Sequence, residues 1–311
     1  MPTGVRDMPL STGNELFRCA EGALAYAGRS LFEEPNPPHA HSFMEIDIVL
    51  AGAGTHLSMR GPDQLQAGDV LVLRPSAWHG YDDCHQLLLH SCCFSTDLLS
   101  RELAWTREDL QLCYLLTTGP YSVQGCGALV THLDPDALAD CQDHLAAPGE
   151  LRHSPVSHYR GDIIGRLTLL FSQLGQAVTQ THPALSSRTH PAIIETMRLL
   201  EAELAYRWTL TDLAGRLSLA PGYLTRLFKS ATGLPPMDYL ARQRTEQGAA
   251  LLLHSDESVT HIGQAVGWPD QSTSARRFKA HYGLSATTYR ARFAKRADRL
   301  DLWPSAAGEY L

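Results

Sequence analysis

The chain has 311 residues, a formal net charge of −7, 44% hydrophobic residues and 19% charged residues. This composition excludes a largely disordered chain or a coiled-coil rod, and the length predicts two domains or one large one. No apolar run reaches the length of a membrane span, and the first residues lack the apolar core of a signal peptide. We therefore expect a cytoplasmic protein without membrane association. The acidic balance by itself speaks against nucleic-acid binding.

The charge is divided unevenly along the chain. A polar segment with two prolines, residues 182–191, is interpreted as an interdomain linker. Residues 1–189 hold 11 lysines and arginines against 21 acidic residues, a net charge of −10. Residues 190–311 hold 15 against 12, a net charge of +3. The basic half could therefore bind DNA, which the acidic half repels.

The first half changes character at residue 96. Residues 24–95 alternate apolar and polar side chains between glycine-rich turns, which predicts several short strands in an antiparallel sandwich or barrel over residues 1–95. The pattern is helical over residues 96–181, and most clearly over residues 155–181. The apolar stripe of that last helix predicts a face buried in its own domain, and the alternative is a helix that packs on its copy in a dimer.

Seven cysteines all lie in the first half of the chain. Their odd number and the absence of a C-x-x-C spacing argue against a disulfide framework or a zinc finger. We expect reduced and mostly buried thiols, and the alternative is a redox pair at Cys92 and Cys93.

A histidine-rich segment begins near residue 38. Because side chains alternate across a strand, His39, His41 and Glu45 would share one face, with Asp47 beside them. A second strand could bring His79 across to them. Three imidazoles and one carboxylate suit zinc, nickel, manganese or iron(II). The alternative is a polar pocket whose histidines hydrogen-bond a ligand or each other.

This spacing resembles the cupin fold. The first cupin motif is matched by His39, His41, Glu45 and Gly52, and the second by Gly68, Pro75 and His79. Ser76-Ala77-Trp78 stands where the second motif usually has a glycine. The resemblance implies a small barrel that holds a metal or a small molecule inside. The residues that we expect to orient such a molecule are Asp47, Trp78 and Tyr81.

The basic half contains a first helix-turn-helix candidate over residues 209–233. A short turn at residues 218–220 separates two amphipathic segments; Pro221 suits the start of the second helix and Gly233 its end. The inward residues are expected to be Tyr223, Leu224, Leu227 and Phe228. The outward face, which suits the major groove of DNA, carries Gly222, Thr225, Arg226 and Lys229.

A second candidate follows over residues 258–283. Gly267 and Pro269 break its first helix, and Asp270 is a plausible N-cap of the second. The side chains expected to face bases or phosphates are Gln271, Ser272, Thr273, Arg276 and Lys279. Both candidates end in a similar basic-aromatic segment followed by glycine, which indicates an internal repeat. Between them, residues 235–253 predict one rigid connecting helix.

This repeat resembles the DNA-binding domain of the AraC/XylS family of transcription regulators over residues 192–292, and we assign residues 192–294 to that domain. The matching positions include Tyr223-Leu224, Arg226, Phe228-Lys229, Gly233, Arg244, Gly267, Asp270, Arg277-Phe278-Lys279 and Gly283. Thr273-Ser274 replaces an aromatic pair of the family, and Ala220 replaces a capping serine. The fold class expected is therefore α+β multidomain, with a cupin-like β-barrel, further helices, and an all-α domain with two helix-turn-helix units.

The resemblance implies a non-enzymatic regulator that binds double-stranded DNA and senses a small molecule, with a sugar or related carbon source as the leading effector. It also implies a homodimer through residues 96–181, and contact with RNA polymerase if the protein is an activator. One alternative is a metal-dependent cupin enzyme, a dioxygenase or an isomerase, because the histidine cluster would serve it equally. Another is a metal- or redox-responsive regulator. We have no physical account of the tail, residues 295–311.

Overall fold

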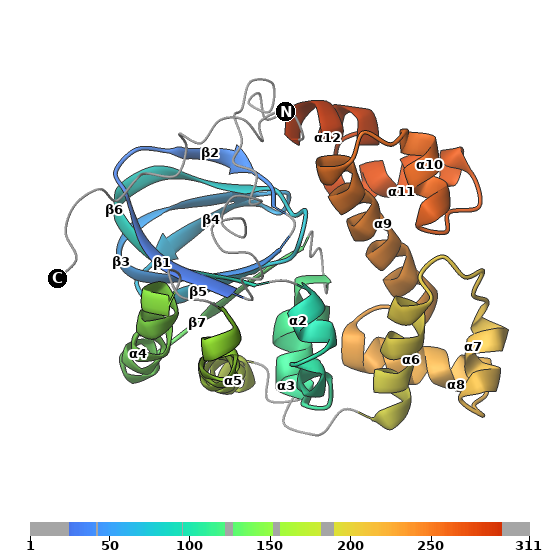
Figure 1. The fold of residues 1–311 in the computed structure, drawn as a ribbon, viewed down its shortest axis with the longest axis horizontal. Helices are drawn as coiled ribbons and strands as arrows, with labels where there is room; N and C mark the ends of the chain where they lie inside the picture. Colours follow the sequence, from blue (N-terminus) through green and yellow to red (C-terminus); the bar gives the residue numbers. More distant parts are fainter. Residues whose placement is uncertain are drawn as a thin grey trace.

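The computed structural model describes residues 25–293 apart from 42, 95, 122–126, 152–155 and 182–189. Its N-terminal domain contains one antiparallel sheet of seven strands in the order β1-β6-β3-β5-β7, with β2 on β6 and β4 on β3. The sheet curls into a barrel (Figure 1). The strands are β1 (Ala25–Phe32), β2 (Asn36–His39), β3 (Met44–Ser58), β4 (Gly61–Gln66), β5 (Asp69–Leu73), β6 (His79–Phe94) and β7 (Ala128–His132).

The last strand corrects the predicted domain boundary. β7 pairs with β5 from Asp69 opposite His132 to Leu73 opposite Ala128. The sheet therefore continues beyond residue 95, and residues 96–181 are not purely helical. The sequence pattern missed β7 because a strand this short carries little periodicity of its own.

β3 is buried on both faces at its start, over residues 44–49. Met44, Ile46 and Ile48 belong to the apolar core outside the sheet. Glu45 and Asp47 alternate with them and are also buried. The strand thus places two carboxylates inside the barrel and three apolar side chains under the covering helices.

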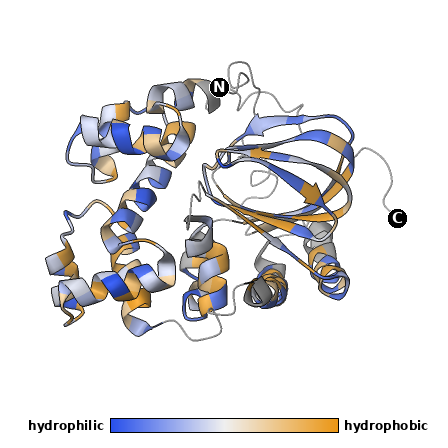
Figure 2. Cartoon of the chain, turned by 180° about the vertical axis from the view of Figure 1, so that it is seen from behind, coloured by the Kyte–Doolittle hydropathy of each residue, from blue (hydrophilic) through white to orange (hydrophobic). Residues whose placement is uncertain are grey.

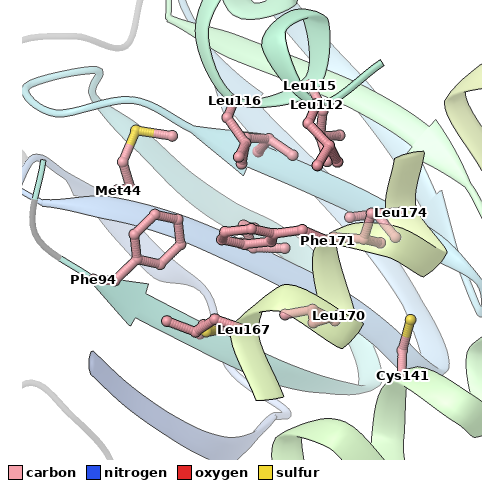
Figure 3. Close-up of a cluster of buried hydrophobic side chains, with 14 of the residues drawn as sticks. Met44, Phe94, Leu112, Leu115, Leu116, Cys141, Leu167, Leu170, Phe171 and Leu174 are labelled. Carbon is pink, nitrogen blue, oxygen red and sulfur yellow. The ribbon is translucent and has the colours of Figure 1, made fainter. Parts of the chain in front are cut away.

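Helix α5 provides much of that cover. Ile163, Leu167, Leu170, Leu174 and Val178 form its buried stripe, which confirms that this face packs within its own domain. The side chains of Phe94 and Phe171 meet with ring centroids 5.4 Å apart (Figure 3). The helical elements before β7 are short, and α4, after it, is a second long helix of 17 residues. These elements are α2 (Thr96–Ser100), η1 (Ala104–Arg107), α3 (Leu110–Cys113), η2 (Tyr114–Thr118), η3 (Gly119–Tyr121), α4 (Pro135–Leu151) and α5 (Val156–Thr181).

The C-terminal domain is helical and contains both predicted helix-turn-helix units. One unit is α7 with α8 and the other is α10 with α11, and the connecting helix α9 runs between them (Figure 1). The helices are α6 (Pro191–Ala202), α7 (Leu210–Arg216), α8 (Pro221–Thr232), α9 (Pro236–His254), α10 (Val259–Ala265), α11 (Gln271–Tyr282) and α12 (Ala286–Phe293). Hydrophobic and hydrophilic residues are interspersed along the helices and strands of both domains, as expected where one face of an element is buried (Figure 2).

The predicted linker and tail lie mostly outside the described residues. Of residues 182–191, only the last two are described: the His190 side chain caps α6 by accepting from the amide of Ala192, and Pro191 is its first residue. Residues 295–311 are not described.

The described cysteines agree with the prediction of reduced, buried thiols. Five are free and buried: Cys84, Cys92, Cys93, Cys113 and Cys141. Cys19 and Cys126 lie outside the described residues. Within the described part of the chain, no helix has the length and apolarity needed to cross a membrane.

Candidate functional site: a buried histidine cluster and two exposed recognition helices

Three of the four predicted metal ligands gather inside the barrel. His39 ends β2, Glu45 lies on β3 and His79 begins β6. Each offers one ligand atom, and these three atoms all lie within 4.8 Å of one another. All three side chains are buried. The prediction that His39 and Glu45 share one continuous strand is wrong, because β2 ends at His39 and β3 begins only at Met44.

His41, the fourth predicted ligand, lies beside this group. Its Nδ1 is 2.9 Å from the carbonyl oxygen of Phe43 and its ring stacks on the Phe43 ring, with centroids 4.2 Å apart. Its Nε2 lies 2.7 Å from Oε2 of Glu45. A carbonyl can only accept, so Nδ1 carries a proton. Nε2 and the carboxylate can therefore stay this close only with a proton or a cation between them.

The other two imidazoles have a ring nitrogen available for a ligand. His39 Nδ1 lies 3.1 Å from the carbonyl oxygen of Pro37, which directs Nε2 away from the backbone. The His39 and His79 rings are 4.2 Å apart at their centroids. His79 Nε2 lies 3.4 Å from Oε2 of Glu45, and neither nitrogen of His79 has a hydrogen-bond partner.

The electrostatics favour the protonation states that a metal requires. Burial lowers the pKa of His39, and burial followed by the charge of His39 lowers the pKa of His79 well below its usual range. Burial alone would raise the pKa of Glu45, but the charge of the adjacent His41 and then the proximity of His79 hold it well below its usual range. Neutral imidazoles and an ionised carboxylate are the forms that bind metals.

The buried, unpartnered polar atoms show that this donor set fits a divalent cation. Oε2 of Glu45 and both nitrogens of His79 lack a hydrogen-bond partner in the barrel interior. Buried polar groups are normally paired, so leaving these orphaned would be costly. Two imidazole nitrogens and one carboxylate oxygen match the ligand preferences of zinc, nickel, manganese and iron(II).

Two of the three predicted effector-binding residues lie in the same interior. The Tyr81 hydroxyl donates to Oδ2 of Asp47, and Oδ1 of Asp47 has no partner. Burial, followed by the charge of Glu45, raises the pKa of Asp47 well above its usual range. Trp78 lies elsewhere: it packs on an apolar cluster that includes Leu252 and Phe278 of the C-terminal domain.

His56 belongs to this interior and was not predicted. It is fully buried on β3, its ring centroid lies 6.0 Å from that of His79 and 5.8 Å from that of Tyr81, and neither ring nitrogen has a hydrogen-bond partner. His56 stands at an even position and Glu45 at an odd one, so a regular strand would place them on opposite faces. The pairing of β3 with β6 shifts register three times between Val49 and Thr55, and such irregularities change which residues face inward.

The first recognition helix, α8, exposes its predicted DNA face. Gly222, Arg226 and Lys229 are exposed and Thr225 is half-buried. Leu224 and Phe228 are buried, as predicted, but Tyr223 is 44% exposed, so its predicted inward position is wrong. Tyr223 follows the exposed Gly222 in the sequence. The apolar pattern of this helix does not distinguish Tyr223 from the buried Leu224, which comes next.

The second recognition helix, α11, is also exposed along its predicted face. Gln271, Ser272, Arg276 and Lys279 are exposed, and Thr273 is half-buried. Asp270 caps this helix through a bond of 2.7 Å from the amide of Thr273, as predicted. The two helices differ here, because Ala220 gives α8 no side-chain cap. Gly233 and Gly283 end the two helices in left-handed conformations, again as predicted.

A barrel with polar groups in its interior, joined to two helix-turn-helix units, defines a class of protein, the two-domain transcription regulators. Comparison with known families agrees: the AraC-like ligand binding domain matches residues 33–184, and a helix-turn-helix domain matches residues 213–292. The chain belongs to the AraC family of DNA-binding transcription regulators, with a ligand-binding domain.

Curated relatives are similar over most of their length. The HTH-type transcriptional activator RhaS of Klebsiella pneumoniae is 26% identical over 279 residues, which cover 89% of this chain and 95% of the relative. The activator RhaR of Yersinia pestis is 24% identical over 257 residues, covering 83% and 85%. Among solved structures, ToxT of Vibrio cholerae has the same fold, with a TM-score of 0.50, 11% identity and coverage of 88% of this chain and 99% of ToxT.

Proposed function

We propose that this protein is a ligand-responsive transcription activator, in which the barrel binds a small molecule and the two recognition helices bind adjacent major grooves of duplex DNA. The observation that carries this proposal is the pair of exposed polar faces on α8 and α11, held on either side of α9 (Figure 1). An activator would also contact RNA polymerase, and the names of the RhaS and RhaR relatives support activation.

DNA binding is tested with Arg226→Ala in the full chain. Arg226 is exposed on α8, where a bidentate contact to a base is worth about 1–3 kcal/mol. We expect operator affinity to fall about 5- to 150-fold, measured by fluorescence anisotropy. Arg198→Ala is the control, because Arg198 is an exposed arginine on α6 that pairs with Glu195. Equal affinity for wild type and Arg226→Ala would contradict the docking of α8.

We also propose that the histidine cluster binds a divalent metal through His39, Glu45 and His79. At a metal concentration about 100 times Kd, binding stabilises the folded chain by about 2.7 kcal/mol. Zinc, nickel, manganese or anaerobic iron(II) should therefore raise Tm, and His79→Gln should abolish the rise. The control is His85→Gln, on the same strand and exposed. A rise in Tm that survives His79→Gln would place the metal elsewhere.

We propose a sugar or a related polyol as the effector, held near Asp47, Tyr81 and the metal. Support comes from Oδ1 of Asp47 and Nε2 of His56, which have no hydrogen-bond partner and can exchange hydrogen bonds with hydroxyl groups. A panel of pentoses and hexoses in the same thermal-shift assay identifies the effector. The same cluster would serve a metal-dependent oxygenase or isomerase, so oxygen uptake or sugar turnover by the metal-loaded chain would favour an enzyme instead.

A homodimer is the final part of this proposal. The outward side of α5 carries Leu169, which is 51% exposed, and Gly161 and Gly165, beside which a Cβ would meet open space. The three residues are spaced four apart and so lie along one face of the helix. An exposed apolar side chain above two glycines would allow two α5 helices to approach closely.

A further inference from the structure

The segment that leads from β5 into the start of β6, residues Arg74–His79, meets the histidine cluster at Ser76 and at His79. Leu73, the residue before it, pairs with Glu45 in the sheet. In its middle, the amide of Ser76 donates to the carbonyl oxygen of His41 at 2.6 Å. Its last residue is His79, which faces Glu45. A change at any of these cluster residues therefore acts directly on this segment.

The same segment also holds the C-terminal domain. The Arg74 guanidinium donates to the Glu246 carboxylate of α9, with Nη2 to Oε2 at 3.0 Å and Nε to Oε1 at 3.1 Å. Both side chains are buried. The Tyr289 hydroxyl of α12 donates to the carbonyl oxygen of Ser76 at 3.2 Å. Trp78 packs in the apolar cluster that contains Leu252.

The backbone of the segment is strained at its centre. Ser76 has φ of 66° and is fully buried, although it is not a glycine. Non-glycine residues in this region persist only where their surroundings hold them, and such strain gathers at switch regions. Here the surroundings belong to both domains, because His41 holds the amide of Ser76 and Tyr289 holds its carbonyl. Movement of either partner would allow the turn to relax.

We propose that Arg74–His79 is a coupling segment, which transmits occupancy of the histidine cluster to the DNA-binding domain. The inference rests on the proposed regulatory function and deepens it by naming the route between ligand and DNA. A ligand that draws Glu45 and His79 together shifts Ser76 and Arg74, and these shift α12 and α9. Since α9 joins the two helix-turn-helix units, its position sets how α8 and α11 meet successive grooves (Figure 1).

Hydrogen–deuterium exchange on the full chain tests this coupling. The cluster is perturbed in two ways: by Zn²⁺ as the probe, and, without metal, by Glu45→Gln or His41→Gln. We expect Zn²⁺ to slow exchange in α9 and α12 by at least about fivefold, the lower end of ordinary allosteric coupling. Each cluster substitution should also change exchange there. The affinity for Zn²⁺ is measured separately by chelator competition.

Two substitutions on the C-terminal side should disconnect the response. In Glu246→Gln and in Tyr289→Phe, Zn²⁺ should still slow exchange around β3, but the effect on α9 and α12 should fall below about twofold. Glu201→Gln is the matched control. Glu201 accepts from Arg107 of the N-terminal domain and from Tyr239, so it forms a second interdomain contact. It lines the same pocket as Arg74 and Glu246, but its N-terminal partner lies outside the segment. That variant should keep the full response.

The outcomes separate the two proposals. If Glu246→Gln and Tyr289→Phe respond as wild type does, or if Glu201→Gln loses the response equally, the coupling segment is wrong even though the cluster binds metal. If Zn²⁺ does not bind, the metal proposal fails. The rate of hydrogen–deuterium exchange in α9 of the Glu45→Gln and His41→Gln variants then still decides whether the segment couples the two domains. Unchanged exchange in α9 for both cluster variants then overturns it.

Discussion

At the scale of single residues, Gly52 shows how strictly the barrel limits one position. Its φ is 77°, a left-handed conformation, and a Cβ added there would lie 2.0 Å from the carbonyl oxygen of Gln86. That oxygen belongs to the backbone of β6 and cannot turn aside as a flexible side chain could. Gly52 is therefore required both by its conformation and by the close approach of the neighbouring strand.

We expect Gly52→Ala to lower the free energy of unfolding by at least about 3 kcal/mol, because it combines backbone strain with a steric clash. Gly61→Ala is the control: Gly61 has φ of 107°, but a Cβ there would meet nothing within 4 Å. It should cost only about 1–2 kcal/mol. Urea denaturation of the two variants measures the difference, and equal losses would show that the approach of Gln86 has no consequence.

The histidine cluster shows what residue spacing can and cannot predict. The motif spacing correctly gathered His39, Glu45 and His79, because loops and strands of fixed length return them to one interior. The spacing did not distinguish His41 from the other predicted ligands, because the position of His41 depends on a local hydrogen bond to Phe43. It also missed His56, whose direction depends on register shifts that leave no mark in the alternation pattern.

At the scale of elements, α5 has one face that the sequence explains and one that it does not. The repeat of apolar residues every three or four positions predicted the stripe that now packs under the sheet. The outward face carries Leu169 among small and polar residues, and an exposed leucine alone needs no explanation. Only the folded helix shows that Gly161 and Gly165 leave open space on the same side.

Leu169→Glu should weaken the proposed dimer by at least about tenfold, corresponding to about 1.4 kcal/mol, because it places a charge in the apolar contact. Analytical ultracentrifugation over a range of concentrations measures the dissociation constant. Leu31→Glu is a well-matched control, since Leu31 is also 51% exposed but lies on β1. A dimer that dissociates equally in both variants, or in neither, would rule out α5 as its interface.

The helix ends of the C-terminal domain were predicted with more success than the helix faces. Pro221, Asp270, Gly233 and Gly283 mark the ends as expected, because each is a strong local signal. The exposed position of Tyr223 depended on which face of α8 packs against its neighbours, which tertiary packing decides.

At the scale of the whole molecule, buried neutral histidines make the fold sensitive to acid. Burial lowers the pKa of His90, inside the N-terminal domain, from 6.5 to about 4. Partial burial also lowers the pKa of His281, which is half-buried in the C-terminal domain, to about 4. The unfolded chain takes up protons on these imidazoles below pH 6.5, whereas the folded chain does so only near pH 4. Stability is therefore complete above pH 6.5 and is lost as the pH falls toward 4.

For His90 alone, the loss at pH 5 amounts to about 2 kcal/mol. We expect His90→Gln to flatten the fall in unfolding free energy between pH 7 and pH 5 by about that amount. Denaturant titrations at each pH provide the measurement, with His85→Gln again as the exposed control on β6. A pH dependence identical to that of wild type in His90→Gln would contradict the assigned cause.

The two-domain plan was visible in the sequence, but the contact between the domains was not. The split in charge and the repeated helix-turn-helix pattern are properties of consecutive residues, so composition and period detect them. Arg74 and Glu246 are separated by 172 positions and meet only in the folded chain. Nothing local distinguishes either from a solvated surface charge. The acidic N-terminal domain thus supplies the cation of its contact with the basic C-terminal domain.

The late position of β7 has a consequence for how the chain folds during synthesis. β5 pairs with β3 on one side and with β7 on the other, yet β7 begins only at Ala128, after all the short helices that follow β6. Until residue 132 leaves the ribosome, the edge of β5 has unpaired backbone groups that can recruit another strand. A nascent chain that pauses between β6 and β7 would be the form most exposed to aggregation and most dependent on chaperones.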